Sequence, residues 1–187
     1  MKTVVIIPAR YKSSRFPGKP LTPILGKPMI LWVAEICAQA LPIESVYIAT
    51  DNSRIKEVVE GAGFNVVMTS EKALTGTDRV ADAANQIDAD IYINVQGDEP
   101  ELPHEGLAAL VEAFRDPKVE LATLMTRLDS SESPTNPSVV KIVCDKLGRA
   151  LYFSRAPIPS GSHARSISIS GTMDPTRRHV GVYAFTP

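Results

Sequence analysis

Residues 4 to 20 read VVIIPARYKSSRFPGKP, and the change from apolar residues to basic and turn-forming ones within this stretch decides the fold class. Its first four residues are apolar, a run too short for a buried helix and typical of a buried strand. After Pro8 come four basic side chains among small and turn-forming residues. A buried strand followed by such a loop is typical of an α/β sheet, in which ligands bind at the carboxyl ends of the strands.

Positive charge is concentrated in this opening part of the chain. The first 34 residues contain no acidic side chain and six basic ones: Lys2, Arg10, Lys12, Arg15, Lys19 and Lys27. The remainder carries 14 basic and 21 acidic side chains. A local group of guanidinium and ammonium ions suits a polyanionic small ligand, most simply a nucleoside triphosphate. A solvated surface turn stays open as an alternative. Nucleic acid is a weaker hypothesis, because no basic stripe with interleaved aromatic residues recurs.

Length and composition set the broad class. The 187 residues, of which 44% are hydrophobic, predict a single α/β domain over 1–187 with a sizeable core, or one domain plus a small appendage. The opening apolar run is too short for a signal peptide, and no stretch approaches the roughly 20 apolar residues needed to span a bilayer. Two cysteines, Cys37 and Cys144, predict buried free thiols rather than a disulfide framework or a metal cluster. We therefore expect a cytoplasmic protein.

Predicted strands and helices alternate along the chain, which indicates βαβ units and a mainly parallel sheet flanked by helices. Strands are expected at 45–49, 65–68, 91–95, 121–125, 139–144, 150–155 and 178–185. Helices are expected from Pro28 to about Leu41, through 55–61, through 80–87 and at 106–114. Met29 and Trp32 are predicted to be core residues of the first helix, and Asp51 or Ser53 to cap the second.

Two further loops carry candidate site residues. In Thr75-Gly76-Thr77-Asp78-Arg79, either Thr77 or Asp78 suits a helix N-cap. The functional alternative is that the small residues admit a base or a phosphate, with Arg79 facing the ligand. Gln96-Gly97-Asp98-Glu99-Pro100 follows the most convincing buried strand. Asp98 is a candidate Mg²⁺ ligand, since Mg²⁺ takes few protein carboxylates together with phosphate oxygens; the alternative is a simple turn.

Familiar nucleotide and hydrolase motifs are absent from the sequence: no GxGxxG follows the first strand, and no GxxxxGK[ST], GxSxG or zinc-ligand spacing occurs. Instead, seven blocks in order resemble the sugar-acid cytidylyltransferases, most closely those acting on 3-deoxy-D-manno-octulosonate (Kdo). The blocks are IPARYKSSRFPGKPL at 7–21, ATD at 49–51, TGTDR at 75–79, NVQGDEP at 94–100, VVK at 139–141, ALYFSRAPIP at 150–159 and RHVGVYAF at 178–185.

The resemblance implies a Rossmann-like nucleotide-diphospho-sugar transferase fold and transfer of CMP from CTP to Kdo, giving CMP-Kdo and pyrophosphate for lipopolysaccharide biosynthesis. On the nucleotide side it implies that Arg10, Arg15 and Lys19 hold the triphosphate. Arg79 and Gln96 also belong to the nucleotide-side blocks. The implied cytosine pocket consists of Pro8, Ala9, Thr75 and Gly76. Asp98 is implied to be the magnesium ligand, and Arg10, Lys19 and Asp98 the catalytic residues.

On the acceptor side, the resemblance implies that Arg155, His179 and Tyr183 face the sugar acid, with Arg155 suited to its carboxylate. Tyr183 can also be read as ordinary strand packing. Family members continue to a segment reading roughly VDTPEDL with a second magnesium carboxylate, which residues 1–187 do not contain. Two alternatives therefore stay open: a cytidylyltransferase for 8-amino-Kdo or another nonulosonate, and a truncated CTP-binding protein without full activity. A homodimer is also implied.

Overall fold

The computed structural model describes residues 1–12, 16–128, 132–158 and 177–187. These residues form two compact units, which are described separately. The first unit contains Met1–Ala122 and Val182–Pro187, and the second contains Thr123–Gly181. Arg15, a predicted triphosphate-binding residue, lies outside the described residues.

The first unit is built on parallel strands in the order β5 (Asn65–Met68), β4 (Val46–Thr50), β1 (Thr3–Ala9) and β6 (Ile91–Asn94). The end of β10 (Arg177–Phe185) pairs antiparallel with β6. The predicted mixed, mainly parallel sheet is therefore confirmed. These strands form because their apolar residues can be buried on both faces, as parallel sheets require.

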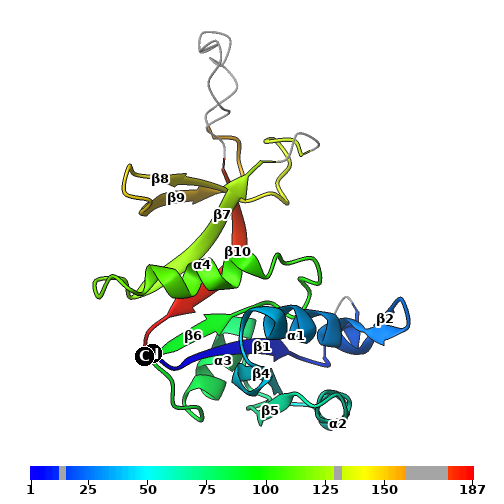
Figure 1. The fold of residues 1–187 in the computed structure, drawn as a ribbon. Coiled ribbons are helices and arrows are strands. Elements are labelled where there is room, and N and C mark those ends of the chain that lie inside the picture. Colours follow the sequence, from blue (N-terminus) through cyan, green and yellow to red (C-terminus); the bar gives the residue numbers. More distant parts are fainter. Residues whose placement is uncertain (13–15, 129–131, 159–176) are drawn as a thin grey trace. The chain divides into compact units, whose positions relative to one another are not determined.

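Helices cover both faces of this sheet (Figure 1). Alternate residues of β1 point to opposite faces. Val4 and Ile6 pack in one cluster with Val80 and Ala83 of α3 (Gly76–Ala84). The remaining alternate residues of β1 face the side of the sheet that carries α1 (Met29–Ala40). Helix α1 in turn contacts α4 (Glu105–Ala113). The sheet thus has a buried core on each side.

The remaining elements of the first unit are short or peripheral. Helix α2 covers Ser53–Gly61, and two 3₁₀ turns, η1 and η2, cover Lys19–Leu21 and Ile43–Ser45. A two-stranded hairpin consists of β2 (Pro23–Ile24) and β3 (Lys27–Pro28). None of the described helices is both long and apolar enough to cross a membrane.

Three local predictions were wrong. The N-cap of α2 is Asn52, whose side chain accepts a hydrogen bond from the Arg54 backbone N–H, rather than Asp51 or Ser53. Trp32 is only partly buried, because its indole N–H reaches the Ile24 carbonyl at the surface hairpin. Cys144 is likewise only partly buried, whereas Cys37 is fully buried. Burial raises the pKa of the Cys37 thiol to about 12.

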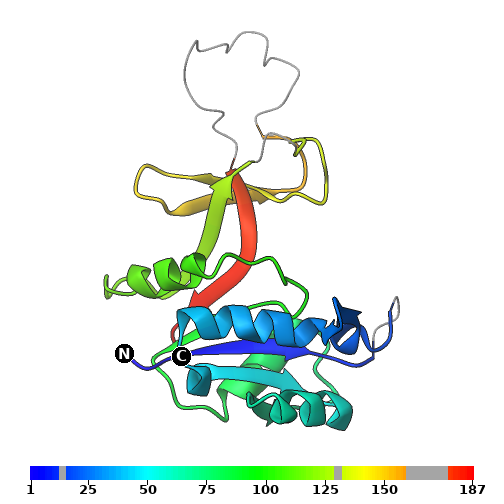
Figure 2. The same ribbon diagram turned by 45° about the vertical axis from the view of Figure 1, so that its right-hand side comes forward.

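The second unit consists of antiparallel strands (Figure 2). Strands β8 (Lys141–Cys144) and β9 (Ala150–Ser154) form a hairpin, with Ile142 opposite Phe153. The first residues of β10 pair with β8, and β7 (Leu121–Arg127) pairs with β10. Most side chains of β9 are exposed, so burial of strand faces contributes less here than in the first unit.

Candidate active site

A cleft of about 480 Å³ opens in the first unit where β1 and β6 end and α3 begins. We call it the nucleotide cleft. It is lined by Pro8, Ala9, Arg10, Phe16, Lys19, Pro20, Met29, Thr75, Gly76, Arg79, Gln96, Gly97 and Asp98. Every described residue predicted on the nucleotide side is among them, as is the predicted metal ligand. The structure therefore brings together residues from three separate parts of the chain.

Two glycines let these three parts approach one another. A Cβ added at Gly97 would lie 3.0 Å from the Pro8 carbonyl oxygen, a distance that real Cβ atoms scarcely reach. A Cβ added at Gly76 would lie 3.3 Å from Oε1 of Gln96 and 3.4 Å from Cγ of Pro8. A side chain at Gly97 would therefore press on the end of β1, and one at Gly76 would require Gln96 or Pro8 to shift.

Lys19 and Asp98 form an ion pair in the cleft, with Nζ 2.6 Å from Oδ2. Their side chains are 43% and 51% exposed, so both charges can be reached by a ligand. Lys19 is positioned by the preceding turn: Gly18 adopts φ +74° and donates its N–H to the Tyr11 carbonyl at 2.8 Å. That left-handed conformation favours glycine, which explains the Gly18-Lys19 sequence.

The start of α3 is fixed by a capping box. Thr75 is the N-cap: its hydroxyl accepts from the Asp78 N–H at 3.1 Å, and the Asp78 carboxylate accepts from the Thr75 N–H at 2.8 Å. These hydrogen bonds, chiefly the side-chain contact with Thr75, lower the pKa of Asp78. The prediction that Thr77 or Asp78 is the N-cap was therefore wrong by two or three positions.

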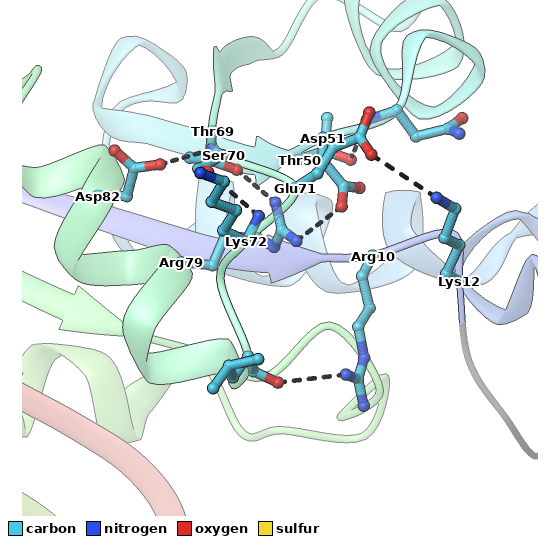
Figure 3. A network of polar contacts seen from close by, with 12 residues as sticks. Arg10, Lys12, Thr50, Asp51, Thr69, Ser70, Glu71, Lys72, Arg79 and Asp82 are labelled. Atoms are coloured by element: carbon cyan, nitrogen blue, oxygen red, sulfur yellow. Dashed lines mark hydrogen bonds and ion pairs between the residues drawn. The ribbon is translucent and has the colours of Figure 1, made fainter.

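Arg79 lines the cleft, but its charge is already paired within the protein (Figure 3). Its guanidinium donates to Oδ2 of Asp51 at 2.9 Å and to the Thr69 hydroxyl. The two charged side chains are only 3% and 12% exposed. Arg79 therefore joins α3 to the ends of β4 and β5 while it lines the cleft, and its contact with a ligand stays a prediction. From the sequence, Asp51 was placed in a family block and predicted as a possible cap but assigned no partner, although its place directly after a buried strand pointed to this edge.

The described cations of the opening loop are more exposed than Arg79. Arg10 donates from Nη1 to the Leu74 carbonyl at 3.4 Å, which directs it toward the segment before α3 (Figure 3). Lys12 lies 3.6 Å from Glu71, and both of these side chains are largely exposed. Among the described basic residues of this loop, Arg10 and Lys19 are therefore the ones that line the cleft.

Three further residues complete the cleft wall. Gln96 donates from Nε2 to the side chain of Asn94 at 3.1 Å, and Asn94 is buried at the end of β6. Sequence reasoning missed Phe16 as a lining residue and assigned Met29 to the core alone. Met29 is 7% exposed, so it belongs to both. An aromatic residue within a basic loop is the signal that could have identified Phe16.

Two predicted acceptor-side residues lie in the second unit. Arg155 is exposed, and its Nη1 donates to the Pro137 carbonyl at 2.8 Å. His179 places Nε2 2.8 Å from the Thr123 hydroxyl, and its ring meets Phe153 edge-on with centroids 4.9 Å apart. Partial burial lowers the pKa of His179, which favours the neutral imidazole. We call Arg155, His179, Thr123 and Phe153 the acceptor cluster.

Tyr183 belongs to the first unit, where it lies opposite Asn94 across the β10–β6 pair. Its neighbours Val182 and Ala184 are fully buried, whereas Tyr183 itself is partly buried. Since successive residues of a strand point to opposite faces, Tyr183 projects away from the core that receives those two side chains. Its role toward a sugar acid stays a prediction.

The described part of the chain contains no preformed metal cluster of three or more ligands. No three His, Cys, Asp or Glu side chains gather there in a way that could hold a metal ion. In the nucleotide cleft, Asp98 offers a half-exposed, hard oxygen donor beside Lys19. This donor set fits Mg²⁺ that arrives with a phosphate ligand, because Mg²⁺ commonly uses one or two carboxylates, water and substrate phosphates.

Comparison with known proteins gives one consistent family. The family model described as "Cytidylyltransferase" matches residues 4–186. A 3-deoxy-manno-octulosonate cytidylyltransferase from Syntrophotalea carbinolica is 47% identical, over 99% of this chain and 75% of that protein. An 8-amino-3,8-dideoxy-manno-octulosonate cytidylyltransferase from Shewanella baltica is 45% identical, over 100% of this chain and 75% of that protein.

A solved structure of CMP:2-keto-3-deoxy-manno-octonic acid synthetase complexed with CTP superposes with a TM-score of 0.88. Its sequence is 41% identical, and the match covers 100% of this chain and 74% of that one. The similarity therefore includes both compact units and every described residue discussed above.

Proposed function

Because the chain belongs to the cytidylyltransferase family, we propose that it transfers CMP from CTP to the anomeric hydroxyl of Kdo for lipopolysaccharide biosynthesis. The single observation that carries this proposal is the nucleotide cleft: its lining residues are those that the family resemblance assigns to CTP. In the reaction the hydroxyl oxygen bonds to the α-phosphorus, the bond from that phosphorus to the bridging oxygen breaks, and pyrophosphate leaves. The hydroxyl proton is released.

Such an in-line displacement depends mainly on positioning and charge neutralisation. We assign the base to the part of the cleft lined by Pro8, Ala9, Thr75 and Gly76, where the small residues leave room for a flat ring. Arg10 and Lys19 bind the triphosphate, as does Arg15 by family resemblance. Arg79, whose guanidinium is held by Asp51 and Thr69, supports the start of α3.

The Lys19–Asp98 pair suggests how nucleotide and metal depend on each other. A triphosphate offers Lys19 more negative charge than one carboxylate does, so nucleotide binding draws the ammonium away from Asp98. The freed carboxylate is then available to Mg²⁺, which when bound supplies charge neutralisation for the departing pyrophosphate. On this proposal, Mg²⁺ binds weakly to the protein without nucleotide.

On the acceptor side, we propose that Arg155 pairs with the carboxylate of the sugar acid and that His179 contacts one of its hydroxyl groups; Tyr183 stays a candidate by family resemblance alone. A bidentate guanidinium–carboxylate pair gives both affinity and orientation. The neutral state of His179, favoured by its burial, allows the ring to act as donor or acceptor toward a hydroxyl.

The experiment is release of pyrophosphate from CTP and Mg²⁺ with Kdo, 8-amino-Kdo or a sialic acid supplied in parallel. We expect Kdo to give the highest kcat/KM. 8-amino-Kdo is the second candidate acceptor because the Shewanella baltica relative is named for it. Faster pyrophosphate release with 8-amino-Kdo would make it the preferred acceptor in place of Kdo. A third outcome separates binding from catalysis. Calorimetric CTP binding without release from any of the three acids would indicate a nucleotide-binding protein and reject the transferase.

A further inference from the structure

Lys141, the first residue of β8, is a charged side chain in an unusual place. It is 1% exposed and is among the largest fully buried side chains of the protein. Its ammonium donates to three backbone carbonyls: Val139 at 2.7 Å, Arg155 at 2.7 Å and Asn136 at 3.2 Å. Lysine has three N–H donors, so these contacts use all of them.

No carboxylate of the described residues forms an ion pair with Lys141. Burying an ammonium ion is costly unless its charge is compensated. Here the compensation comes from three oriented carbonyl dipoles on two separate segments of chain. The favourable geometry exists only while both segments stay in place, so the buried charge makes their arrangement specific.

The two segments are also joined in the opposite direction. The guanidinium of Arg155 donates to the carbonyl of Pro137, which lies between two of the residues that Lys141 holds. Lys141 therefore binds the backbone of Arg155, while Arg155 binds the segment that Lys141 also binds. We call this arrangement of Lys141, Arg155 and residues 136–139 the Lys141 clasp.

The clasp also reaches His179 through the backbone. In the sheet of the second unit, Lys141 lies between Ser154 of β9 and Arg178 of β10, the residues that precede Arg155 and His179. The His179 backbone N–H donates to the Val140 carbonyl at 2.8 Å. A shift of β8 would therefore move both Arg155 and His179.

We propose that Lys141 is a positioning residue for the acceptor: it fixes Arg155, and with it the site for the sugar-acid carboxylate, without touching substrate. The expected change in kinetics rests on the proposed function, whereas the expected change in local stability rests on the Lys141 clasp alone. We expect loss of the ammonium to weaken use of the sugar acid while use of CTP is retained.

The first test is steady-state kinetics of Lys141→Met, which keeps a linear side chain of similar length. We expect the KM for the sugar acid to rise about 10- to 100-fold, because misplacing a binding group by about 1 Å is enough for such a loss. The KM for CTP should stay within about twofold. Lys146→Met is the matched control, since Lys146 is exposed on the same β8–β9 hairpin, and it should behave as wild type.

A double-mutant cycle with Arg155→Ala separates positioning from general damage. If Lys141 acts through Arg155, adding Lys141→Met to Arg155→Ala raises the KM for the sugar acid little further. Fully multiplicative effects, or equal rises in the KM values of both substrates, would overturn the inference. An inactive wild-type protein would instead reject the proposed function.

Hydrogen exchange tests the clasp independently of activity. Amide protection over 138–141 and around Arg155 should fall in Lys141→Met and stay unchanged in Lys146→Met. Unchanged protection in Lys141→Met would overturn the inference even if the enzyme is inactive. Should Lys141→Met fail to fold, Arg155→Ala is measured instead. Loss of the Pro137 contact should then lower protection of the same segment, and full protection would contradict the clasp.

Discussion

The nucleotide cleft and the acceptor cluster are built by different means. The cleft lies at the ends of parallel strands whose side chains are buried on both faces, and Gly76 and Gly97 allow the close packing of its walls. The acceptor cluster lies on antiparallel strands with many exposed side chains, and polar contacts such as the Lys141 clasp fix its residues. The first region depends on packing, and the second depends on a few hydrogen bonds.

This difference has a functional meaning under the proposed reaction. Every sugar-acid cytidylyltransferase must hold the same nucleotide, so a cleft fixed by packing suits a constant substrate. Acceptors vary within the family, as the two relatives named for Kdo and 8-amino-Kdo illustrate. A region held by a few polar contacts can change its specificity by a few substitutions while the core stays intact.

The largest effect is expected in the cleft itself. Lys19→Ala or Asp98→Asn should lower kcat by about 10²–10³-fold, the usual loss when one charge-stabilising group is removed. The measurement is pyrophosphate release at saturating CTP. Lys12→Ala is the matched control from the same loop, because Lys12 is largely exposed and lies 3.6 Å from exposed Glu71. A near-normal rate for either cleft variant would reject the assigned roles.

Asp51→Asn tests whether the cleft also depends on a buried charge pair. The substitution leaves the nearly buried Arg79 without its counter-charge. Removing one partner of such a pair typically costs about 3 kcal/mol or more in the free energy of unfolding. Urea denaturation gives this quantity. Glu60→Gln breaks the exposed Lys56–Glu60 pair and should change it by less than about 0.5 kcal/mol. Equal effects would contradict the buried pairing.

Gly97→Ala tests the packing of the cleft directly. The added methyl group would lie 3.0 Å from the Pro8 carbonyl oxygen, so the strand ends must separate. We expect a loss of about 1–3 kcal/mol in the free energy of unfolding, with weaker CTP binding. Gly61→Ala at the end of α2 meets no atom within 4 Å and should be neutral or slightly stabilising. An unchanged free energy of unfolding in Gly97→Ala would show that the cleft accommodates a methyl group without strain.

Sequence alone was most informative where structure depends on long apolar runs. The parallel strands and the helices between them were predicted to within a few residues, because hydrophobic periodicity reports burial directly. Helix caps were harder to predict, because Asn52 and Thr75 each stand beside other residues suited to capping. The local backbone conformation decides which of them is the cap. The partial exposure of Trp32 depends on its bond to a surface hairpin.

For the candidate site, the sequence identified the cleft residues but not how they are partnered. The pairing of Arg79 with Asp51 joins residues 28 positions apart, which no local pattern reveals. Lys141 shows the same limit more strongly. It stands in a block quoted for its family resemblance, yet lysine is so rarely buried that nothing in the sequence indicated a buried ammonium. Both cases depend on contacts between segments rather than on periodicity.

The smallest effect is expected in the pH dependence of stability that His179 contributes within the acceptor cluster. Burial lowers its folded-state pKa below the ordinary 6.5, so the unfolded chain binds a proton more readily. The stability contributed by neutral His179 is therefore fully present above pH 6.5 and decreases as the pH falls through 6.5 toward the lower folded value. Denaturation midpoints of wild type and His179→Gln, measured from pH 8 to 5, should keep a constant difference above 6.5. Below that pH the wild type should lose stability relative to the variant. A wild type that gains stability on acidification would mean that the ring is held as imidazolium, and the acceptor cluster would then attract the sugar-acid carboxylate through two cations rather than through Arg155 alone.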